Sequence, residues 1–264
     1  MIESPHVVQI APAPAPAIAE PAKSHSCGCK KRYCPRKIQS VSGVVFGLMM
    51  VQHLAVNFLG LWPERYQAAV DRIYGLGPWL PWLSLTLVFL PLAVHVGLGL
   101  KLLKGAGLAY QTGKHHHGGD LRYLLQRLSA VILLVFIGLH VLTLHSWGLH
   151  QVYRLTGWNS LDAYASSGLF HPTDAHASTA RAIRTLASSA GPLASGNVAV
   201  MGLYLLAIWA TAYHLANGLS TTAMVWNLTR TPDSERRLAI ICAGFGIALA
   251  CVGTLAWCAF TVLA

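Results

Sequence analysis

Four of the chain's thirteen histidines stand where an ionisable side chain is costly. His53, His95, His140 and His214 each lie well inside a different long apolar segment. An ionisable residue within a membrane-embedded segment marks a functional site by default, because its desolvation must be offset by a specific partner. Any one of the four can also be an ordinary core histidine bonded to a neighbouring hydroxyl or carbonyl. Their relative depths therefore decide between the two interpretations.

The depths of these histidines group them into two pairs. His53 lies 14 residues past Gln39 and His140 lies 13 residues past Arg127, about 21 and 20 Å at 1.5 Å per residue. His95 lies 17 residues past Pro78 and His214 lies 17 residues past Asn197, about 25 Å each, along segments expected to run the opposite way. Each pair shares a level, and the two levels are about 15 Å apart in a hydrocarbon core of about 30 Å.

Two imidazoles facing each other across a helix bundle are what a six-coordinate haem needs, and apolar walls bury its macrocycle. The pairs therefore predict two haems. No Cys-x-x-Cys-His motif occurs, so covalent c-type attachment is not expected. Small residues let a ring approach the helices, although close packing of membrane helices explains part of them without a cofactor. They are Gly43, Gly47, Gly97, Gly99, Gly138 and Gly218.

The segments that position these histidines are long enough to span a bilayer. The chain is 54% hydrophobic and 11% charged, against about 25% charged in a soluble domain, and its mean hydropathy is +0.50. These values exclude disorder, collagen and an ordinary soluble enzyme. Each span must be helical to satisfy its backbone in lipid, so we expect an all-α membrane protein. The expected spans are Gln39–Trp62, Trp79–Leu103, Leu124–Trp147, Asn197–Val225 and Leu238–Val262.

The basic residues predict the topology. Of the 19 Lys and Arg residues, fourteen lie in the N-terminal tail or in the connections on the same side, and five lie on the other side. The positive-inside rule then places the N-terminus in the cytoplasm and the C-terminus outside. The net charge of +10 comes in short blocks between apolar runs, which favours membrane topology over a nucleic-acid partner.

Two regions fall outside the spans. Residues 1–38, with their Ala-Pro repeats, read as a flexible tail ahead of the transmembrane domain of residues 39–264, and no cleavable signal is expected. Cys27, Cys29 and Cys34 form a weak metal-ligand pattern, and an unstructured or locally docked tail is the favoured interpretation. The outer connection Gly148–Gly196 is expected to carry short amphipathic pieces on the membrane surface.

The order of these histidines across four of five helices resembles the five-helix, two-haem cytochrome b subunit of succinate:quinone oxidoreductases, the succinate dehydrogenases and fumarate reductases. The resemblance covers about Gln39–Phe260. Its carriers are QSVSGVVFGLMMVQHL, LAVHVGLGLKLL, RLSAVILLVFIGLHV and YHLANGL, with HHHGGD resembling that family's cytoplasmic loop.

This resemblance implies a multi-pass subunit of the bacterial inner membrane. It would anchor a flavoprotein and an iron–sulfur subunit, and relay electrons between the iron–sulfur subunit and a membrane quinone, menaquinone being the expected species. The subunit itself carries no flavin chemistry. His95 and His214 would hold the haem nearer those partners, His53 and His140 the distal one. Gln39 and Ser40 match residues that help hold a haem propionate in related subunits.

Quinone chemistry has weaker candidates. Some relatives have an acidic residue at the outer end of the first span, where this chain offers Glu64 and Asp71, and neither aligns cleanly. Both are more simply read as solvated loop charges, and His145 as an interfacial side chain. Two other functions remain open: a di-haem cytochrome b subunit of another dehydrogenase, of hydrogenase or formate dehydrogenase type, and a transporter whose histidines relay protons.

Overall fold

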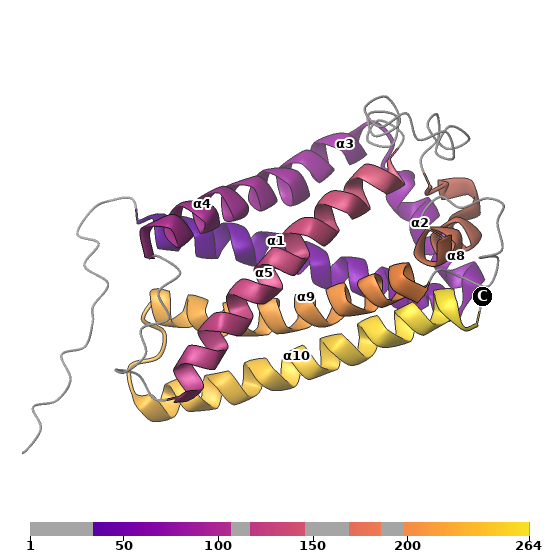
Figure 1. Ribbon diagram of the computed structural model, residues 1–264. Coiled ribbons are helices and arrows are strands. Elements are labelled where there is room, and N and C mark those ends of the chain that lie inside the picture. The colour runs from indigo at the N-terminus through magenta and orange to yellow at the C-terminus, as the bar shows by residue number, and fades with distance from the viewer. Residues whose placement is uncertain (1–33, 107–116, 146–168, 186–197, 264) are drawn as a thin grey trace, which may run out of the picture. The chain divides into compact units, whose positions relative to one another are not determined.

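Every secondary-structure element in the part of the chain that the structure describes is a helix (Figure 1). The computed structural model describes residues 34–106, 117–145, 169–185 and 198–263. Within these residues, five helical segments are long and apolar enough to cross a membrane, which confirms the prediction of an all-α membrane protein with five spans. They are Pro35–Leu61, Trp79–Leu102, Leu121–Leu144, Val198–Val225 and Pro232–Thr261.

The first and last long helices begin before the apolar runs that predicted them. Helix α1, Pro35–Phe58, starts four residues ahead of Gln39, because Pro35 brings a pre-set φ to the first turn and lacks the N–H that would be unsatisfied there. Helix α10, Pro232–Thr261, starts six residues ahead of Leu238. There Thr231 and Ser234 form a reciprocal capping box. An apolar run marks where a helix enters hydrocarbon, whereas its first turn lies in the polar interface.

The second span changes its helical geometry halfway. It consists of α3, Trp79–Ser84, a π-helical turn η2, Leu85–Phe89, and α4, Leu90–Ala106. The N–H of Leu90 donates to the carbonyl of Leu85, and the next residue, Pro91, has no N–H to continue an α-helical ladder. A π-helical turn contains one residue more than an α-helical turn. The side chains that follow it, including that of His95, therefore point about 100° further around the helix than they would in a continuous α-helix.

The long helices pack side by side around α1 and α9 (Figure 1). Helix α1 contacts α4, α9 and α10, while α9, Val198–Val225, also contacts α10 and α5, His117–Leu144. Glycines permit these close approaches. A Cβ at Gly47 of α1 would lie 2.5 Å from Leu215 Cδ1 of α9, and one at Gly253 of α10 would lie 2.5 Å from Ile208 Cγ2 of α9.

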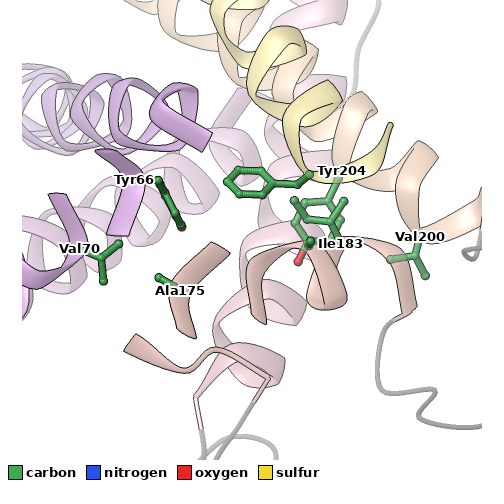
Figure 2. Close-up of a cluster of buried hydrophobic side chains, with 8 residues drawn as sticks. Tyr66, Val70, Ala175, Ile183, Val200 and Tyr204 are labelled. Carbon is green, nitrogen blue, oxygen red and sulfur yellow. The ribbon is translucent and has the colours of Figure 1, made fainter. Parts of the chain in front are cut away.

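Short helices cover one end of the long ones, and we call this layer the cap. It comprises α2, Pro63–Tyr74, the 3-10 turn η4, Pro172–Asp174, and α8, Ala175–Thr185. Figure 2 shows side chains of α2, α8 and α9 converging in its buried cluster. The cluster consists of Tyr66, Val70, Ala175, Ala180, Ile183, Val200, Tyr204 and Phe260. Short amphipathic pieces were expected in this connection, and α8 lies there, in contact with α2, α9 and α10.

Polar contacts tie the two halves of the cap together. The amide of Gln67 donates to the Pro172 carbonyl over 2.7 Å and accepts from the Ala175 N–H over 2.9 Å. The hydroxyls of Tyr66 and Thr179 lie 3.0 Å apart. Tyr66 is only 4% exposed. Burial raises the pKa of its phenol, an effect that the bond to Thr179 partly offsets.

Candidate functional site

The four mid-span histidines meet as two pairs. The ring centroids of His53, on α1, and His140, on α5, are 6.1 Å apart, with their planes at 82°. Those of His95, on α4, and His214, on α9, are 6.2 Å apart, with their planes at 85°. These are the pairs that the depth estimate groups together. As whole residues, His53 is exposed and the other three are half-buried.

The spacing within each pair suits one shared metal atom. A metal–imidazole bond is about 2.0 Å, so two imidazoles on one metal have nitrogens about 4 Å apart and centroids about 6 Å apart. Among the described residues, no three His, Cys, Asp or Glu side chains gather into a metal-binding group. A pair of histidines alone is a poor cage for a bare ion, but it completes a haem, whose macrocycle brings the other four nitrogens. The donor set therefore fits haem.

His95 is held by the backbone of α1. Its Nδ1 lies 3.0 Å from the carbonyl of Gln39. The ring reaches that carbonyl because Gly43 has no side chain: a Cβ there would lie 2.7 Å from His95 Nδ1 and Cε1. A metal-bound imidazole donates its second N–H to an acceptor, which fixes the tautomer and the ring orientation. With Nδ1 donating to Gln39, Nε2 is the nitrogen left for a metal.

His214 is held by a buried hydroxyl on α5. Its Nδ1 lies 3.2 Å from Ser129 Oγ, and the same hydroxyl donates to the Gln126 carbonyl over 3.0 Å. The Gln126 side chain donates to the His214 carbonyl over 3.2 Å and accepts from the Asn217 amide over 2.8 Å. These contacts hold both the backbone and the ring of His214, on α9, against α5.

His140 lies among aromatic side chains. Its Nδ1 is 3.4 Å from the hydroxyl of Tyr204. Its ring stacks on Phe136 at a centroid distance of 5.4 Å, and Phe136 meets Tyr204 edge to face at 5.0 Å. Tyr204 belongs to the buried cluster of the cap and Phe136 packs against that cluster, so both residues connect the cap with His140.

Gln39 and Ser40, the expected propionate partners, both lie near the first turns of α1. Gln39 supplies the carbonyl at His95, and its side-chain Nε2 faces Gly99, where a Cβ would lie 3.1 Å away. Ser40 Oγ donates to the Lys37 carbonyl and accepts from the Trp226 indole, both over 2.8 Å. Gln39 therefore contacts the His95/His214 pair directly, whereas the contacts of Ser40 are with Lys37 and Trp226.

An arginine that the sequence did not single out lies at the same end. The Arg122 guanidinium donates to Asn217 Oδ1 over 2.7 and 3.1 Å and to Ser220 Oγ over 3.4 Å. The Tyr213 hydroxyl donates to the Arg122 carbonyl over 3.2 Å. The YHLANGL segment, which contains His214, thus also contributes Tyr213 and Asn217 to a polar network between α5 and α9.

The quinone candidates lie at the capped end. Glu64 and Asp71 are exposed on α2, and Asp71 accepts from the Gln67 amide over 2.8 Å. His145 is exposed just beyond α5, with Nδ1 3.2 Å from the Val141 carbonyl.

Of the three cysteines in the weak metal-ligand pattern, Cys34 is buried immediately before α1, whereas Cys27 and Cys29 lie outside the described residues.

The fold and these contacts define a class of protein: a helical membrane protein whose described residues form five apolar spans and bring four imidazoles together in two pairs. Comparison with curated proteins then finds a relative, the succinate dehydrogenase cytochrome b558 subunit of Bacillus subtilis (strain 168). The two are 26% identical over 227 residues, which cover 85% of this chain and 95% of the relative. No protein-family model and no solved structure matches the chain. The chain resembles the cytochrome b subunit of succinate dehydrogenase, as the order of its histidines predicted.

Proposed function

We propose that this protein is the di-haem membrane anchor of a succinate:quinone oxidoreductase, relaying electrons between an iron–sulfur subunit and a membrane quinone, menaquinone in the simplest case. The observation that carries the proposal is the pair of centroid distances, 6.1 and 6.2 Å, on four different spans. The similarity to the Bacillus subtilis subunit along most of both chains supports the same function. A transporter with proton-relaying histidines does not call for two imidazole pairs at metal-sharing distance.

The chain's own residues would bind and orient the cofactors. His53 and His140 would hold one haem, His95 and His214 the other, each through Nε2. Bound haem supplies one-electron chemistry. With each Nε2 bound to haem iron, the Gln39 carbonyl, Ser129 and Tyr204 would accept from the second ring nitrogen of three of the four ligands and so hold the rings in the binding orientation. In a membrane, the apolar spans would keep water away from both sites.

The two ends of the molecule would serve different partners. The end where α1 begins carries Lys37, Arg127 and Arg230, and fourteen of the 19 basic residues of the chain are expected on that side. We assign this end to the cytoplasm and to docking of the iron–sulfur subunit, which in turn binds the flavoprotein. The capped end, with Glu64, Asp71 and His145, is the proposed region for quinone. Lipid of the bacterial inner membrane would surround the spans.

A haem determination on the purified protein tests the assignment. A pyridine haemochrome assay should find two b-type haems per chain, with low-spin spectra typical of two histidine ligands. No haem, or one haem per chain, would contradict the proposal. Soluble subunits that co-purify from native membranes separate this function from the runner-up: a flavoprotein that oxidises succinate supports it, and a hydrogenase or formate dehydrogenase subunit overturns it.

A further inference from the structure

Each histidine pair includes one member whose second ring nitrogen meets a buried side-chain hydroxyl. For His214 this is Ser129, which is 6% exposed, and for His140 it is Tyr204, which is 9% exposed. The two hydroxyls lie on different helices, α5 and α9, and on different levels of the bundle. In each case the histidine and the hydroxyl come from opposite helices, so the contact also bridges α5 and α9.

The chemistry of the contacts assigns donor and acceptor. When Nε2 of a histidine binds a metal, Nδ1 carries the proton and must donate it. The Ser129 hydroxyl can accept this bond, because its own hydrogen goes to the Gln126 carbonyl 3.0 Å away. The Tyr204 hydroxyl, 3.4 Å from His140 Nδ1, would accept from His140 once Nε2 binds a metal. An acceptor on Nδ1–H makes the imidazole a stronger electron donor and so stabilises the oxidised form of the metal.

We propose that Ser129 and Tyr204 are paired positioning residues, each tuning the reduction potential of one cofactor site: Ser129 that of the His95/His214 site and Tyr204 that of the His53/His140 site. This inference rests on the proposed function, because it concerns residues that act through haem ligands. If so, each hydroxyl group sets the reduction potential of one site independently of the other. Each acts through its histidine and not through direct contact with the haem.

The test is a redox titration of the purified haem-loaded protein carrying Ser129→Ala or Tyr204→Phe. Loss of the acceptor should shift the reduction equilibrium of one haem toward the reduced form by about two- to tenfold, where tenfold corresponds to 59 mV for one electron. Ser129→Ala should move only the His95/His214 component, and Tyr204→Phe only the other. Single-haem variants, His140→Ala and His214→Ala, assign the two components.

Matched variants separate tuning from packing. Ser129→Thr keeps the hydroxyl and should restore the original potential. Tyr213→Phe removes a hydroxyl from the same helix as Tyr204, but one that donates to the Arg122 carbonyl, and should leave both potentials unchanged. Selective loss of the matching haem in Ser129→Ala, with rescue by Ser129→Thr, would also support the inference. Unchanged potentials, a shift of the wrong component, or loss of both haems would overturn it. Absence of haem from the unaltered protein would instead refute the proposed function.

Discussion

Removing either member of one histidine pair should empty one site and leave the other filled. His53→Ala and His140→Ala should lose the same haem component, and His95→Ala and His214→Ala the other, because each pair meets at about 6 Å while drawing on different helices. The haem content of the purified variants, resolved by low-temperature spectra, is the measurement. His145→Ala, which changes an exposed histidine beyond α5, should keep both haems. Loss of the same component in His53→Ala and His95→Ala would show that the pairing is wrong.

Gly43 should be needed for haem binding at the His95/His214 site, because it leaves room for the His95 ring. In Gly43→Ala the new Cβ would lie 2.7 Å from the His95 ring, and the ring must move away from the Gln39 carbonyl. Overpacking of this kind costs about 1–3 kcal/mol, and occupancy of that site should fall while the His53/His140 site stays filled. Gly244→Ala on α10, where no atom lies within 4 Å of the new Cβ, is the control. Equal haem content in the two variants would argue against a cradle at Gly43.

At the residue scale, sequence reasoning found the histidines but not the groups that hold them. Depth along a helix follows from counting residues, so the partners within each pair could be predicted. The roles of the Gln39 carbonyl, Ser129 and Tyr204 depend on how α1, α5 and α9 face one another, which an apolar pattern does not specify. Ser129, in the SAVILL stretch, carries no signal that distinguishes it from an ordinary small residue of a packed span.

At the element scale, the five spans were predictable because hydrocarbon thickness dictates their length. Their ends differ by a few residues, since capping residues and prolines in the interface extend α1 and α10 beyond the apolar runs. The π-turn ahead of Pro91 was not predicted, and neither was the packing of α8 onto α2. The π-turn depends on which carbonyls the backbone N–H groups reach, and the packing of α8 depends on which apolar faces lie next to it. Both are properties of the tertiary structure.

The cap should lose stability in alkaline solution. Burial holds the pKa of Tyr66 above its ordinary value of 10.0. Its stabilising contribution is therefore fully present below about pH 10 and is lost as the pH rises towards the higher folded pKa. The slope is at most about 1.4 kcal/mol per pH unit. Thermal unfolding in detergent between about pH 9 and 11 should show this slope in the unaltered protein and a shallower one in Tyr66→Phe. Tyr123→Phe, which changes a tyrosine 50% exposed on α5, should retain the original slope. Identical slopes in Tyr66→Phe and the unaltered protein would exclude Tyr66 as the titrating group.

At the scale of the whole molecule, the two ends differ in chemistry. One end has the Arg122 network and the His95/His214 pair; the other has the cap and the His53/His140 pair, linked through Tyr204. A protein that accepts electrons from a docked subunit at the basic end and delivers them to quinone at the capped end needs both pairs. Quinone binding at the basic end, beside the iron–sulfur subunit, needs only the nearer pair.

Succinate:quinone activity in a variant that lacks only the His53/His140 haem distinguishes these two arrangements. If quinone reacts at the capped end, activity of the fully assembled His140→Ala complex should fall by about tenfold or more, because electrons no longer reach that end. His53→Ala should behave in the same way, since it removes the facing ligand. Succinate oxidation with a soluble dye as acceptor is the control and should stay unchanged, because it needs only the flavoprotein and iron–sulfur subunits. Near-normal quinone reduction in both variants would place the quinone site at the basic end and remove Glu64, Asp71 and His145 from the catalytic path.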